Sequence, residues 1–120
     1  FKKKGYKFLT LIHPSAILAK DVISEEGAQI MAGAVIQPGV RIGRNVIVNT
    51  RASIDHDCII GDHAHIAPGA TLSGAIQVGE AVHIGTGATV IQGINIGVES
   101  IVAAGAVVYR NVESKKTVSR

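Results

Sequence analysis

The chain has 120 residues and a formal net charge of +3, and its hydrophobic residues include only two Phe, two Tyr and no Trp. This length fits one domain, and an interior built of Ile, Val and Ala suits a narrow core. Basic residues are absent from Ala52 to Tyr109 and no eighteen-residue apolar run occurs, so neither nucleic-acid binding nor a membrane span is expected.

The first eleven residues come before any regular pattern. They contain four lysines, in contrast to the aliphatic sequence that follows. We expect residues 1–11 to be a linker, an end cap or the last part of another domain, and not part of the main core.

A period of six governs the sequence that follows. An aliphatic residue stands at every sixth position from Ile12 to Val108, and only Ser24 interrupts the series. Four positions after each of these residues comes a second small or aliphatic one. Two inward residues on either side of a corner, repeated without insertions, are typical of a parallel β-solenoid. With three hexads to a triangular coil of eighteen residues, the repeat predicts about five coils.

The corners of the coils are also visible in the sequence. Glycine is frequent three positions after the aliphatic residue, and the same position holds Asp21, Asn45, Asp57 and His63. These residue types tolerate positive φ angles, which tight corners require. The general crossover rule predicts that such a coil is right-handed.

The repeat assigns the histidines to particular faces of the prism. His65, His83 and Asn49 point outward from one face, whereas His56 lies at the corner opposite that face. One side of the triangle is roughly 15–20 Å long, so His56 and this face cannot form one site within a single chain. A shared site therefore requires two subunits, and three-fold closure suits a triangular prism.

His56 is the strongest candidate for acid–base chemistry. It lies between Asp55 and Asp57, and a carboxylate beside an imidazole orients the ring and increases its basicity. Cys58 follows at an inward position, where we expect a buried structural thiol. A lone buried thiol favours a reducing compartment, and we expect the protein in the cytoplasm.

Several motifs in this region resemble a known family. The motifs are Asn49-Thr50, Asp55-His56-Asp57-Cys58, Ile60-Gly61-Asp62, His65 with Ala67-Pro68-Gly69-Ala70, and the opening His13-Pro14-Ser15-Ala16. They resemble the hexapeptide-repeat acyltransferases, in particular the subgroup of sialic-acid O-acetyltransferase-like proteins and N-acetyltransferases of UDP-linked 4-amino-sugars. The resemblance implies an all-β, left-handed parallel β-helix and a homotrimer with active sites between subunits.

The resemblance also implies roles for individual residues. His56 would be the catalytic base, Asp57 the residue that tunes it, and Asn49 a neighbour of the reacting group. His65 would contact acetyl-CoA, the co-substrate, and main-chain contacts to it would fall on Gly74, Thr86 and Ala104. The acceptor would be an amino or hydroxyl group of a nucleotide-linked amino-sugar or a sialic acid, with no metal. No role follows for His13, His63 or His83.

The resemblance divides the chain into three parts. Residues 1–11 would be a linker or the remnant of an N-terminal nucleotide-sugar domain. Residues 12–109 would form the β-helix acyltransferase domain, and residues 110–120 a truncated C-terminal tail.

Two alternatives remain open from the sequence. A zinc-dependent, carbonic anhydrase-like enzyme on the same fold would bind zinc across a subunit interface, with His65, His83 and His56 as ligands. Such enzymes use a His-x4-His pair, and no two histidines here have that spacing. The other alternative is a trimeric scaffold without catalysis.

Overall fold

The computed structural model describes residues 10–119, and within them every regular element is a β-strand of two residues. The part of the chain that it describes contains no helix that could cross a membrane. The segment expected to be a linker or domain remnant, residues 1–11, lies almost wholly outside the described residues.

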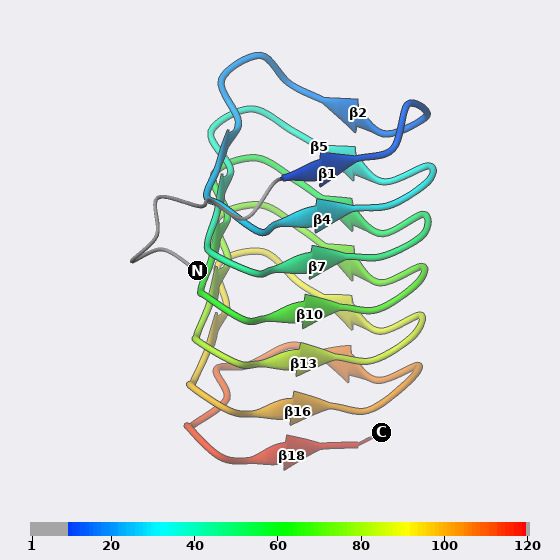
Figure 1. The fold of residues 1–120 in the computed structure, drawn as a ribbon. Coiled ribbons are helices and arrows are strands. Elements are labelled where there is room, and N and C mark those ends of the chain that lie inside the picture. Colours follow the sequence, from blue (N-terminus) through cyan, green and yellow to red (C-terminus); the bar gives the residue numbers. More distant parts are fainter. Residues whose placement is uncertain (1–9, 120) are drawn as a thin grey trace.

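The strands form three parallel sheets, one on each side of a triangular prism (Figure 1). Sheet A contains β1 (Leu11–Ile12), β4 (Gln29–Ile30), β7 (Ile47–Val48), β10 (His65–Ile66), β13 (His83–Ile84), β16 (Ile101–Val102) and β18 (Thr117–Val118). Sheet B contains β2 (Ile17–Leu18), β5 (Val35–Ile36), β8 (Ser53–Ile54), β11 (Thr71–Leu72), β14 (Thr89–Val90) and β17 (Val107–Val108). Sheet C contains β3 (Ile23–Ser24), β6 (Arg41–Ile42), β9 (Ile59–Ile60), β12 (Gln77–Val78) and β15 (Asn95–Ile96).

The coil is left-handed. In Figure 1 the chain descends from β1 to β18, runs to the right along sheet A in front and returns to the left behind it. The general crossover rule, which predicts a right-handed coil, is therefore wrong here. That rule rests on the right-handed twist of longer strands, and strands of two residues accumulate little twist.

Successive coils stack in a fixed register of eighteen residues. His65 pairs with His83, and Ile66 with Ile84, across β10 and β13. The aliphatic residue of each hexad and the residue four positions later fill the interior, and from Ala28 onward they form one continuous buried core. The all-β solenoid and its three faces are therefore confirmed, and dispersion contacts along the stacked columns hold the coils together.

Most corners have the backbone conformation that the sequence predicts, whereas Asp21, at the same position of the repeat, does not have a positive φ. Seven glycines have φ between 68° and 80°, and Asn45, Asp57 and His63 have φ between 55° and 63°. Positive φ also occurs at five residues that the sequence does not mark as corner formers, namely Arg51, Ala75, Ala81, Glu99 and Lys115. Hydrogen bonds between successive coils hold these corners in place. For example, the N–H of Ala75 donates to the carbonyl of His56 at 2.8 Å.

The coils continue beyond Tyr109, where the sequence places the start of a tail. Val112 bridges to Ile96, and β18 pairs with β16 in sheet A. Eighteen strands at three per coil make about six turns, one more than expected. The last coil is shorter, because Ile101 pairs with Thr117 at an offset of 16 residues instead of 18.

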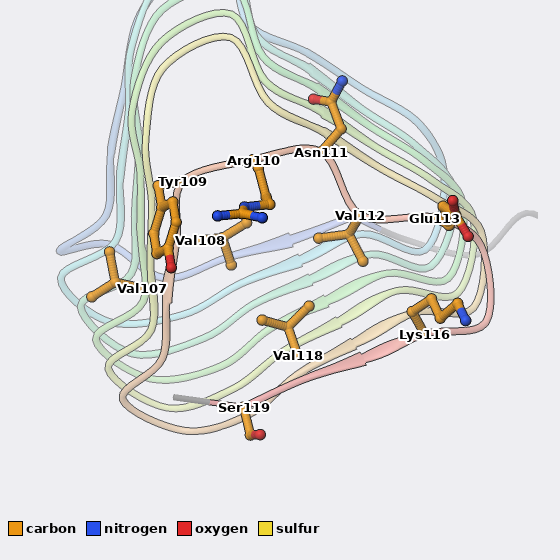
Figure 2. Close-up of a pocket in the computed structure, with 10 residues that line it drawn as sticks. All are labelled: Val107, Val108, Tyr109, Arg110, Asn111, Val112, Glu113, Lys116, Val118 and Ser119. Carbon is orange, nitrogen blue, oxygen red and sulfur yellow. The ribbon is translucent and has the colours of Figure 1, made fainter.

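The C-terminal end of the prism is hollow. A cavity of about 400 Å³ opens there, and Val108, Val112 and Val118 point into it (Figure 2). At its rim the guanidinium of Arg110 lies 5.1 Å from the ring centre of Tyr109. The cavity is the open end of the hydrophobic core.

Candidate active site

His56 lies at the corner between sheets B and C, separated from β8 by Asp55, and Asp57 follows it at a positive φ of 58°. A carboxylate oxygen of Asp57 lies 3.2 Å from His56 Nδ1. Because an ionised carboxylate only accepts hydrogen bonds, this contact favours the tautomer in which Nδ1 carries the proton. The other nitrogen, Nε2, is then free to accept a proton.

Asp55 fixes the backbone before this pair. Its carboxylate accepts a hydrogen bond from the N–H of His56 at 2.7 Å, which holds the chain at the end of β8. The side chain of His56 remains 51% exposed, so a substrate can reach the ring.

Gly74 occupies the equivalent corner one coil further on, as the repeat predicts. A side chain there would lie within 2.6 Å of His56 Cε1 and 2.9 Å of His56 Cδ2, which is too close for any real contact. The imidazole thus fills the place of the missing side chain, and Gly74 itself is buried.

Cys58 lies in the interior beneath this corner, as expected. Its thiol donates a hydrogen bond to the carbonyl of Ser73 at 3.1 Å, which links it to the residue before Gly74. Burial raises the pKa of the Cys58 thiol above its ordinary value, and the charges of Asp55 and Asp57 add to this effect. The thiol is therefore neutral and structural in character.

A second cluster of polar residues lies on sheet A. The amide nitrogen of Asn49 is 3.2 Å from His65 Nε2, and the Asn49 side-chain oxygen accepts a hydrogen bond from the N–H of Thr50 at 2.7 Å. Asn49 and His65 thus meet, as their common face predicts. Partial burial lowers the pKa of His65, and the charge of neighbouring His83 lowers it further.

Thr86 and Ala104 lie on successive coils at the corner between sheets A and B. The carbonyl of Thr86 accepts a hydrogen bond from the N–H of Gly105 at 2.9 Å, and both Thr86 and Ala104 are exposed. Their positions continue the line of Thr50 at the same corner. Of the residues predicted to bind cofactor, Gly74 thus lies beside His56, whereas Thr86 and Ala104 lie at the corner that follows sheet A, the sheet of His65.

His13 and His63 are separate from both groups, whereas His83 lies against His65. His13 Nδ1 lies 2.8 Å from the hydroxyl of Ser15 at the N-terminal coil, and His63 Nδ1 lies 3.4 Å from the Asn45 amide. Among residues 10–119, no three His, Cys, Asp or Glu side chains come together as metal ligands. His65 and His83 are neighbours on sheet A, whereas His56 lies at the opposite corner, so one chain does not form the three-histidine zinc site considered above.

A shallow groove beside His56 was not predicted from the sequence. It has a volume of about 190 Å³ on the outer surface of sheet B and is lined by Gln37, Ser53, Ile54, Asp55, Thr71, Leu72 and Ser73. In the sequence, the groove could have been recognised from the polar residues that stand beside the aliphatic residues of sheet B. They give the groove hydroxyl, amide and carboxylate groups that can form hydrogen bonds with a polar ligand.

The chain is similar to several known proteins. The family model described as the hexapeptide repeat of succinyl-transferase matches residues 75–110. A GDP-perosamine N-acetyltransferase of Escherichia coli O157:H7 is 33% identical over 72 residues, which cover 60% of this chain and 33% of that protein.

Solved structures match nearly the whole chain. The acetyltransferase domain of PglB from Neisseria gonorrhoeae FA1090, in complex with acetyl coenzyme A, has a TM-score of 0.97 and 40% identity over 99% of this chain and 58% of that one. PerB from Caulobacter crescentus, in complex with CoA and GDP-perosamine, has a TM-score of 0.97 and 39% identity over 99% of this chain and 57% of that one. The chain thus spans less than two thirds of these relatives, and its predicted resemblance to the hexapeptide-repeat acyltransferases is confirmed.

Proposed function

We propose that this hexapeptide-repeat β-helix transfers an acetyl group from acetyl-CoA to the amino group of a nucleotide-linked sugar. The observation that carries the proposal is the His56 ring, which is held at Nδ1 by Asp57 and whose side chain is half-exposed. The relatives crystallised with acetyl coenzyme A, or with CoA and GDP-perosamine, support this co-substrate and this class of acceptor.

In the proposed reaction, His56 Nε2 removes a proton from the acceptor amine as its nitrogen attacks the thioester carbonyl. The carbonyl oxygen becomes negatively charged, and a backbone N–H near Gly74 stabilises it. When the tetrahedral intermediate collapses, the carbon–sulfur bond breaks and the protonated imidazole returns the proton to the departing sulfur. Asp57 stabilises the imidazolium between these two steps.

The arrangement of the two residue groups supports a site built between subunits. His56 and Gly74 lie at the corner of sheets B and C, whereas Asn49 and His65 belong to sheet A. We propose a homotrimer in which sheet A of one subunit faces the His56 corner of the next. His65, Thr86 and Ala104 would then bind the co-substrate across the interface, and Asn49 would lie beside the reacting group. We propose that the trimer acts in the cytoplasm.

The test is the activity of a His56→Ala variant with acetyl-CoA and GDP-perosamine, measured by the release of free CoA thiol. Loss of a general base reduces kcat by about 10²–10⁴-fold. His63→Asn is the matched control, because His63 is an exposed corner histidine and Asn tolerates its positive φ of 63°. We expect the control to retain wild-type activity. Light scattering should give both variants the same molar mass as the wild-type protein. A His56→Ala variant with near-normal kcat would exclude the proposed base.

A further inference from the structure

The carboxylate of Asp57 packs against a glycine of the preceding coil. Gly39 lies at the same corner, between β5 and β6, with a φ of 80°. A side-chain carbon at Gly39 would overlap Oδ1 of Asp57 and would lie 3.1 Å from its Cγ. The carboxylate therefore occupies the space that any other residue at position 39 would fill.

Hydrogen bonds on both sides keep this corner in place. The N–H of Gly39 donates to the carboxylate of Asp21 at 3.1 Å, in the coil before it. The N–H of Asp57 donates to the carbonyl of Pro38 at 3.0 Å. Because both bonds fix the backbone at Gly39, the corner cannot easily move away from a larger side chain.

We propose that Gly39 is a positioning residue for the His56–Asp57 pair. Its lack of a side chain lets one oxygen of the Asp57 carboxylate lie over Gly39 while the other reaches His56 Nδ1. This inference rests on the proposed function, in which Asp57 sets the tautomer of the catalytic base.

The need for glycine at this position goes beyond its backbone angle. Gly93 lies at the same corner three coils later and has a nearly identical φ of 78°. A side-chain carbon at Gly93 would meet no atom within 4 Å, apart from its chain neighbours. Alanine therefore introduces the same backbone strain at both positions, but only at Gly39 does it collide with a carboxylate.

The experiment compares Gly39→Ala with Gly93→Ala. We expect kcat to fall at least about 10-fold in Gly39→Ala, because a small misplacement of a catalytic group is costly, and to stay near wild type in Gly93→Ala. The nitrogen chemical shifts of the His56 ring report its tautomer directly. They should indicate protonation at Nδ1 in wild type and in Gly93→Ala, and a mixture of tautomers in Gly39→Ala.

A second comparison in the Asp57→Ala background keeps the test decisive. With the carboxylate removed, Gly39→Ala should cause no further change in kcat or in tautomer. Equal losses for the two glycine variants, or a further loss from Gly39→Ala in that background, would overturn the role of Gly39. Failure of the proposed function would look different, since His56→Ala would then retain activity while the tautomer of His56 still responded to Gly39→Ala.

Discussion

The imidazole of His65 meets that of His83 edge to face, with ring centres 4.9 Å apart and ring planes at 80°. The two residues are direct partners on β10 and β13, so the register of sheet A enforces this contact. Burial lowers the pKa of His65 below its ordinary value of 6.5, and the charge of His83 lowers it further. The folded protein therefore favours neutral His65.

This relationship predicts that acid destabilises the fold through His65. His65 binds a proton more readily in the unfolded chain than in the folded protein. Its contribution to stability is therefore complete above the ordinary pKa of 6.5. This contribution is lost as the pH falls below 6.5 and through the lowered pKa of the folded protein. Melting temperatures measured from about pH 8 to about pH 5 should decrease less steeply for His65→Gln than for wild type. Parallel curves for the two proteins would contradict this prediction.

Gly74→Ala should impair catalysis without straining the backbone. Gly74 does not have a positive φ, so alanine is compatible with its conformation, but the new methyl group would enter the space of the His56 ring. We expect the ring to be displaced and kcat to fall by about 10-fold or more. Steady-state kinetics and a crystal structure of the variant would check this outcome. An unmoved ring with normal kcat would show that the contact is unimportant.

Ser100→Ala should destabilise the last coil. Ser100 is fully buried, and its hydroxyl donates to the carbonyl of Glu113 at 2.6 Å and accepts the N–H of Lys116 at 3.3 Å. Alanine would leave both backbone groups without this partner, at a cost of about 1–3 kcal/mol in the free energy of unfolding. Urea denaturation measures this difference. Ser114→Ala, an exposed change in the same coil, should stay within about 0.5 kcal/mol of wild type.

The period of six was sufficient to predict the faces, the inward residues and much of the candidate site. Because side chains recur at the same place every eighteen residues, it placed Gly74 above His56 and put Asn49 on the same face as His65. It also identified Asp57 as a corner residue, and its φ is positive. Each of these features depends only on the position within the repeat.

Features that depend on contacts between particular side chains were not predictable in this way. Residue type alone also did not mark Ala75 and Glu99, which adopt positive φ because they occupy the same position of the hexad as Asp57 and are held by backbone hydrogen bonds to the preceding coil. The shortened last coil could not be inferred either. It is held by the hydrogen bond from the Ser100 hydroxyl to the carbonyl of Glu113, and the repeat identifies Ser100 only as an inward position. The sequence likewise gave no sign that Gly39 differs from Gly93 in its surroundings.

The position of His56 and Asp57 along the prism has a consequence for local unfolding. Their corner is covered by Gly39 on one side and Gly74 on the other, so it belongs to three successive coils in the middle of the stack. In an array in which each coil touches only its neighbours, opening begins at the ends and spreads inward. Amide hydrogen exchange should therefore be slow at this corner and faster toward both termini, so the pair remains intact while the outer coils fray.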